Sequence, residues 1–303
     1  MRITGPGRIS ERIELLGNYD MSMYLVKGDE GLIIGGGMSY IVPEVEEQFA
    51  RLDFDLGRVR YLVIPHSHFD HCGAVPYLKR RLPDLQILAA QYASEVLVKP
   101  KVVDFIARVN KDMVDRLGLQ AEYDRLCLEF DGVPVDRVVG DGDVLDLGQG
   151  IEAQFAEVPG HSRCCVATYI PQLRALFPTD AVPLPSDVGD ELSYPSAQFD
   201  FSAYMNSLHK LMQYEVEVVG LDHKGAFLGD QARDFMRRGL EQTERTRDYI
   251  LEQYREIGDL EKTAEKIAAE VFEKNDLAYM SHQLMVSITR SMIDSLVANE
   301  RRT

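Results

Sequence analysis

The sequence has no tryptophan, few cysteines and no long apolar run. Its four cysteines, at positions 72, 127, 164 and 165, form no C-x-x-C pair, so no disulfide framework is predicted. No apolar stretch approaches the roughly 20 residues that a membrane-spanning helix needs. Residues 1–16 lack the apolar core of a signal peptide. We therefore expect a cytoplasmic protein that makes no contact with a membrane.

Positive charge is also scarce. Lysine and arginine total 33 against 49 for aspartate and glutamate, which gives a net charge of −16. Such a surface repels a phosphate backbone, so nucleic acid is not an expected partner. The composition over 303 residues, 45% hydrophobic and 27% charged, is that of a globular chain. This length suits one large domain or two modest ones.

The order of apolar segments predicts a strand-rich body followed by a helical tail. Strand patterns separated by turn signals fall at residues 12–36, 61–64, 85–88, 135–177 and 216–219. Residues 91–130 are largely helical in pattern and interrupt this series. We therefore divide the chain into a body of residues 1–230 and a helical extension of residues 231–303.

Three of the seven histidines lie within the six residues HSHFDH at positions 66–71. This H-x-H-x-D-H motif directly follows an apolar strand. A strand end that leads into a tight turn directs His66 and His68 at one point, and Asp70 and His71 at a second point nearby. Imidazole and carboxylate together suit Zn, Fe or Mn, so the motif predicts a metal site.

The motif resembles the metal-binding signature of the metallo-β-lactamase superfamily. Three later segments are similar to the family's other ligand turns, in the same order. Residues 159–162 (PGHS) resemble the G-H-[ST] turn, residues 176–180 (LFPTD) the L-F-x-G-D strand end, and residues 220–225 (GLDHKG) the last P-G-H-G turn. The resemblance spans residues 12–225. It implies an α+β fold, a four-layer αββα sandwich with a C-terminal helical extension that covers the active site.

Carried over position by position, the resemblance implies a dinuclear metal centre. The implied ligands are His66, His68 and His161 for the first metal, Asp70, His71 and His223 for the second, and Asp180 as the bridge. The two divalent ions would be Zn, Fe or Mn, and a hydroxide that bridges them would attack the substrate. Asp70 is expected to orient this hydroxide and to handle a proton as the leaving group departs.

The sequence departs from the family pattern at three places. The strand-end I-D-x-G reads IGGG at residues 34–37, which removes a carboxylate that often supports the ligand turn. Pro178 stands at or near the glycine of L-F-x-G-D, and Leu221-Asp222 replaces the proline and glycine before the last histidine. The ligand set stays complete, and His223 has the weakest surrounding pattern.

The helical extension resembles those of glyoxalase II and of the thioesterase-like quinolone-signal response protein. The extension covers the metal site in such proteins, so its apolar residues and those of the loop after Asp180 are candidates for the substrate wall. The candidate substrate residues are Tyr194, Phe199, Tyr279, His282 and Met285. An apolar wall that carries methionine suggests a small-molecule substrate with an acyl or aromatic group.

Together these patterns predict a metal-dependent hydrolase of a small ester, thioester or lactone. Two alternatives stay open: a small-molecule phosphodiesterase of the same fold, and a metal-loaded regulator that has no enzymatic activity. The last expected helix, residues 277–299, carries an apolar stripe that either packs on the body or forms a homodimer interface.

Overall fold

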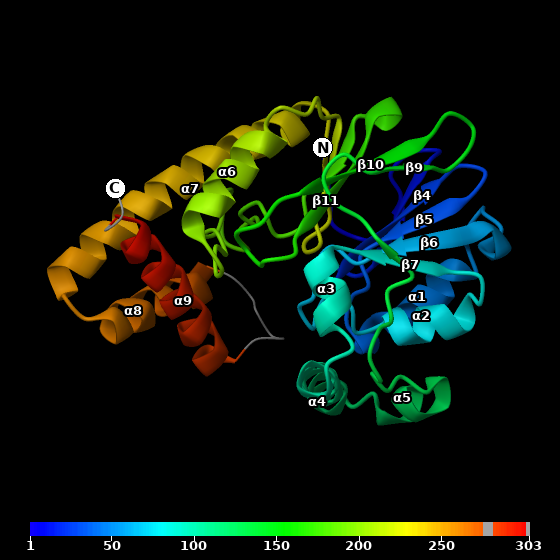
Figure 1. The fold of residues 1–303 in the computed structure, drawn as a ribbon, viewed down its shortest axis with the longest axis horizontal. Coiled ribbons are helices and arrows are strands. Elements are labelled where there is room, and N and C mark those ends of the chain that lie inside the picture. Colours follow the sequence, from blue (N-terminus) through cyan, green and yellow to red (C-terminus); the bar gives the residue numbers. More distant parts are fainter. Residues whose placement is uncertain (275–280, 301–303) are drawn as a thin grey trace.

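A computed structural model describes residues 1–274 and 281–300. It contains two seven-stranded sheets packed face to face (Figure 1). The strands of the first sheet, in spatial order, are β2 (Gly7–Arg8), β3 (Ile13–Gly17), β4 (Ser22–Lys27), β5 (Gly31–Ile34), β6 (Val59–Val63), β7 (Gln86–Ala89) and β8 (Arg137–Val138). Those of the second are β1 (Arg2–Ile3), β14 (Ala226–Leu228), β13 (Val218–Gly220), β12 (Ala175–Phe177), β11 (Val166–Ile170), β10 (Glu152–Glu157) and β9 (Val144–Asp146).

Helices cover the outer face of each sheet. On the first sheet lie α1 (Val42–Phe49) and α2 (Val75–Arg81), and on the second lie α6 (Phe201–Leu211) and the first half of α7 (Asp230–Ile257) (Figure 1). One apolar core fills the space between the sheets and under α1 and α2, and another lies between the second sheet, α6 and α7. The layer order is therefore αββα, which confirms the expected α+β sandwich.

Burial on both faces explains why the central strands read as continuous apolar runs. Every residue of β4 and of β5 is buried, as expected for strands covered by a sheet on one side and by helices on the other. The lysine of β4, Lys27, is buried as well, and its Nζ lies 2.9 Å from a carboxylate oxygen of Glu14 on β3. The charge is tolerated there because it is paired.

The helical segment predicted at residues 91–130 forms three helices between β7 and β8: α3 (Gln91–Val96), α4 (Pro100–Leu117) and α5 (Gln120–Leu126). Proline suits the first turn of α4, because the first amides of a helix have no partner within it. The helix ends at Gly118, which adopts the left-handed conformation at φ 69°. Buried Ile106 and Val114 attach α4 to the main core.

The tail consists of α7, α8 (Leu260–Lys274) and α9 (His282–Glu300). The first half of α7 packs on the second sheet, and its second half packs on α8 and α9. On α9, Met292, Ile293 and Leu296 of the apolar stripe are buried against the rest of the chain. No helix in the described residues is long and apolar enough to span a membrane. The division at residue 230, which coincides with the first residue of α7, stays a prediction.

Candidate metal centre

The predicted ligands lie in turns that follow four strands. His66 follows β6, His161 follows β10, Asp180 follows β12, and His223 follows β13. Strands β10, β12 and β13 run in the same direction, because β12 and β13 are parallel and β11 lies antiparallel between β10 and β12. Their carboxyl ends therefore meet at one edge of the second sheet, next to the turn after β6.

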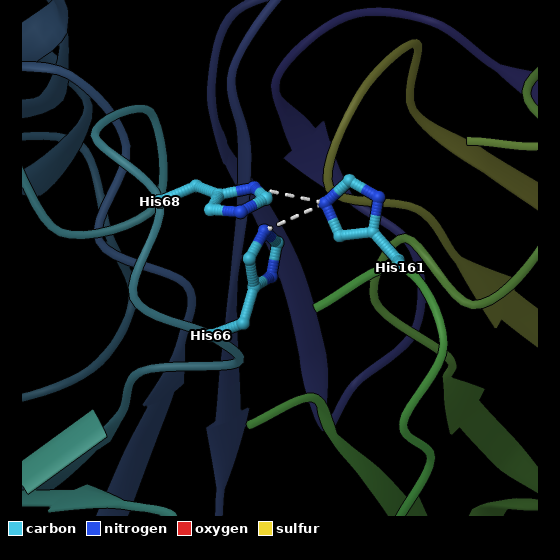
Figure 2. Close-up of side chains that lie close together, drawn as sticks. All are labelled: His66, His68 and His161. Carbon is cyan, nitrogen blue, oxygen red and sulfur yellow. Dashed lines mark hydrogen bonds between the residues drawn. The ribbon is translucent and has the colours of Figure 1, made fainter. Parts of the chain in front are cut away.

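Three imidazoles form the first half of the cluster. Nε2 of His161 lies 3.2 Å from Nε2 of His66 and 2.9 Å from Nδ1 of His68. Figure 2 shows the three rings pointing at one another. A tetrahedral site with ligand bonds of about 2.0–2.1 Å separates its ligands by about 3.3 Å. The three nitrogen atoms are therefore spaced as donors to a single cation.

Asp70, His71 and His223 form the second half. Nε2 of His71 lies 3.6 Å from one carboxylate oxygen of Asp70, and Nε2 of His223 lies 3.7 Å from the other. Asp180 stands between the halves, with Oδ2 at 3.3 Å from Nε2 of both His71 and His161. Buried Nε2 of His71 and Oδ1 of Asp180 make no hydrogen bond with the described residues. The donor set therefore fits divalent cations, and Asp180 lies within reach of donors of both halves.

Three of the histidines are held through the ring nitrogen that faces away from the cluster. The partners are Thr179 Oγ1 for His66 at 3.0 Å, the Ser196 carbonyl for His161 at 2.7 Å, and the Asp20 carbonyl for His223. Such contacts fix the tautomer and the orientation of a ligand ring. The cluster is thus oriented by the protein itself.

The fourth partner is a carboxylate that sequence reasoning did not assign. Oδ2 of buried Asp222 lies 3.3 Å from Nδ1 of His71. At Gly36, in the segment that lacks the family's acid, an added Cβ would lie 2.4 Å from Val75 and 2.7 Å from the His71 carbonyl. That segment packs directly on the ligand turn, and the supporting carboxylate comes from the opposite sheet instead. The signal in the sequence was the acid that directly precedes His223.

Burial sets the charge state of the cluster. Burial disfavours a charged imidazole, and together with neighbouring histidines it lowers the pKa of His66 well below its usual value and that of His68 to about 3. For Asp180, burial alone would raise the pKa, but His161 and His71 hold it well below the usual value. His71 differs: burial alone would lower its pKa, but Asp70 and Asp180 raise it well above the usual value, so this ring must lose a proton before it binds a metal.

A cavity of about 290 Å³ opens over this cluster. His68, Asp70, His161, Asp180 and His223 line its inner end. Its walls are mainly apolar and come from α4, from the loop after Asp180 and from the tail. The apolar wall residues from these three regions are Val102, Phe105, Ile106, Val182, Leu184, Tyr194, Pro195, Val271, Leu284, Met285, Ile288 and Met292.

Two of the five predicted substrate residues, Tyr194 and Met285, line this cavity. Phe199 is 50% exposed and lines a neighbouring depression instead. His282 is exposed and is not among the residues that line the cavity, and Tyr279 lies outside the described residues. The structure therefore brings the loop and the buried face of α9 to the cluster, but not the exposed face of α9.

The wall contributed by α4 was missed at the level of sequence. Val102, Phe105 and Ile106 lie on one face of that helix, and Phe105 is 44% exposed although it lines the cavity. The available signal was the helical spacing of these apolar residues. That spacing is equally typical of a helix face that packs on a core.

The loop of residues 183–199, which we call the strap, is attached next to a predicted ligand. Nζ of Lys224, the residue after His223, lies 2.8 Å from a carboxylate oxygen of Asp187 in the strap. The hydroxyl of Tyr19 donates to the other carboxylate oxygen at 2.8 Å. The strap is therefore held in place as one wall of the cavity.

Comparison with known proteins agrees with this geometry. The model of the metallo-β-lactamase superfamily matches residues 18–223. A probable metallo-hydrolase of Burkholderia pseudomallei is 29% identical over 48% of this chain, and the match covers 42% of that protein. Ribonuclease J of Mycolicibacterium smegmatis is 28% identical over 54% of this chain and 31% of its own length. The chain thus spans less than half the length of these two relatives.

The fold also resembles solved structures. The inverting sec-alkylsulfatase Pisa1 of Pseudomonas sp. superimposes with a TM-score of 0.64 over 96% of this chain and 50% of its own, at 17% sequence identity. Since the family model covers more than half of the residues, this chain belongs to the metallo-β-lactamase superfamily.

Proposed function

We propose that this chain is a dinuclear metal-dependent hydrolase of a small ester, thioester or lactone with an apolar acyl or aromatic group. The observation that supports this most directly is the apolar cavity that opens on the predicted ligands. Two divalent ions (Zn, Fe or Mn), when bound, would lower the pKa of a water between them and polarise a carbonyl oxygen. The apolar walls would hold the acyl group beside them.

Asp70 is the proposed proton-handling residue. Its carboxylate lines the cavity and is 8% exposed, so it reaches substrate while most of it stays out of solvent. Its oxygens face His71 and His223 at 3.6 and 3.7 Å. From this position Asp70 would orient a water molecule toward the carbonyl carbon and pass its proton to the leaving group.

A phosphodiester substrate is the second candidate, because ribonuclease J is among the relatives. The net charge of −16 and the apolar walls favour an uncharged acyl group at the cluster over a polynucleotide. A small phosphodiester with an apolar group is compatible with both features. The same panel of substrates separates the two candidates.

The test begins with metal content per chain on protein purified without chelators. We expect about two metal ions, and hydrolysis of octanoyl thioesters, octanoyl esters or long-chain lactones at least tenfold faster than bis(p-nitrophenyl) phosphate. The reverse order would favour the phosphodiesterase. Two metals without turnover of any of these substrates would favour the regulator, and the absence of metal after addition of Zn, Mn and Fe(II) would contradict both enzymes.

A further inference from the structure

The metal cluster borders a second hollow. This side depression, of about 380 Å³, is lined by Tyr92, Ser162, Arg163 and Phe199, among others. It shares His68 and His161 with the apolar cavity, and also Ser67, Val102 and Gln198. The two hollows therefore adjoin each other at the first half of the cluster.

Two cationic side chains, Lys224 and Arg163, occur among the described residues that line these hollows. Lys224 is buried and paired with Asp187. Arg163 is exposed, and its guanidinium lies 5.1 Å from the centre of the Tyr92 ring. It makes no ion pair or hydrogen bond with any residue that the structure describes. Arg163 is thus the cation at the site whose charge is not neutralised.

The chemistry of arginine indicates what this position recognises. An arginine in a chain of net charge −16 has many carboxylates to pair with, and many arginines here do so, for example Arg81 with Glu46. The cation–π contact with Tyr92 restrains the guanidinium and leaves its N–H donors free. A planar guanidinium pairs with a carboxylate or a phosphate through two parallel hydrogen bonds.

We propose that Arg163 binds an anionic group of the substrate, a carboxylate or a phosphate, while the apolar group of the same molecule fills the cavity. The bond that breaks would lie over the cluster, between these two ends. This inference rests on the proposed hydrolase and narrows its substrates to acyl compounds with an anionic leaving group. Uncharged simple esters and lactones would be poorer substrates.

Binding of stable amides tests the anion site without turnover. The probes are N-octanoyl-β-alanine, N-octanoyl-O-phosphoethanolamine and uncharged N-octanoyl-β-alaninamide, titrated calorimetrically into zinc-loaded protein. We expect at least one of the two anions to bind about tenfold more tightly than the neutral amide. Arg163→Ala should abolish this preference, and Arg163→Lys should retain part of it. Arg51→Ala, at an arginine on the surface whose side chain is 79% exposed, is the matched control and should leave the preference unchanged.

Two results would overturn the proposal. Equal binding of charged and neutral amides by the wild-type protein would show that no anion site exists. A preference that survives Arg163→Ala would place the anion elsewhere, for example on the metal ions. The tighter of the two anions identifies the group as carboxylate or phosphate.

Turnover then separates this proposal from the proposed function. Octanoyl thioesters of 3-mercaptopropionate (anionic) and of N-acetylcysteamine (neutral) differ in leaving-group charge. We expect Arg163→Ala to raise KM about tenfold for the anionic thioester only, with kcat unchanged. If both thioesters were hydrolysed with equal efficiency, the role of Arg163 would be wrong and the proposed hydrolase would still stand. If the amides bound in an Arg163-dependent way but no thioester were hydrolysed, the proposed hydrolase would be wrong and the anion site would still stand.

Discussion

The ligand cluster and the roof of the cavity are built in opposite ways. The cluster consists of buried and half-buried polar side chains in short turns, and hydrogen bonds or an ion pair orient all of its rings except that of His68. The roof, formed by residues of α8 and α9, presents apolar side chains such as Met285 and Ile288 to the cavity. Geometry is therefore specified residue by residue in the cluster, whereas in the roof shape and size matter more than the identity of any one side chain.

The largest effect should come from the cluster. Asp180→Ala removes the carboxylate that faces both halves, so metal content should fall from about two ions to one or fewer. Activity should fall about a thousandfold, which corresponds to about 4 kcal/mol of activation free energy. Elemental analysis and initial rates check this. The control is His209→Ala, at an exposed histidine outside the site; if Asp180→Ala kept two metals and full rate, the bridging assignment would be wrong.

A smaller loss of metal affinity is expected at Asp222, which contacts His71 but is not itself a predicted ligand. Asp222→Asn keeps the shape of the residue but removes the charge that faces Nδ1 of His71. Loss of such a supporting carboxylate typically weakens metal binding by about 10–100-fold. Competition with a chromophoric chelator measures this, and Asp222→Glu should restore part of the affinity. Asp53→Asn, at an exposed carboxylate, is the control, and equal metal affinity in Asp222→Asn and Asp53→Asn would reject the role of Asp222.

A larger side chain in the roof should raise KM for substrates with a long acyl group. Ile288→Trp places a larger side chain in the cavity, so KM for an octanoyl thioester should rise about tenfold while that for an acetyl thioester changes less than about twofold. Metal content should stay at its wild-type value, which distinguishes this variant from those of the cluster. Ser287→Trp adds the same ring on the exposed face of α9 and should change neither KM. An equal rise in KM for both substrates would mean that the roof does not select acyl length.

The smallest effect is expected at His282. Its ring is exposed and lies 5.7 Å from that of Phe272, away from the cavity. Exposed substitutions usually change the free energy of unfolding by no more than about 0.5 kcal/mol. His282→Ala should therefore keep KM, kcat and thermal stability near those of the wild-type protein. A tenfold rise in KM would instead return His282 to the substrate wall, where sequence reasoning placed it.

The comparison also explains what could be predicted from sequence. The first ligand motif is local: four donors within six residues after an apolar strand predict a metal site without further information. His161, Asp180 and His223 are far apart in the chain and were assigned through resemblance to a family. The described structure places all seven side chains together.

The features that could not be predicted from the sequence depend on long-range packing. Apolar residues of α4 show the same helical spacing whether they face a core or a cavity. The sequence therefore could not predict that α4 forms a wall of the cavity. The role of Asp222 depends on how closely the segment around Gly36 packs on the ligand turn. Strand β14 lies outside the predicted strand segments, because its pairing with β1 and β13 is set by the fold and its three residues carry no period of their own.

The attachment of the strap has a consequence for protein engineering. Because Lys224 directly follows a predicted ligand and also holds Asp187, the strap and the ligand turn form one exchangeable unit. A strap taken from another superfamily member without an acid at this position would leave a buried lysine uncompensated beside the metal site. Libraries that aim to change the substrate range should therefore vary the strap and residue 224 together.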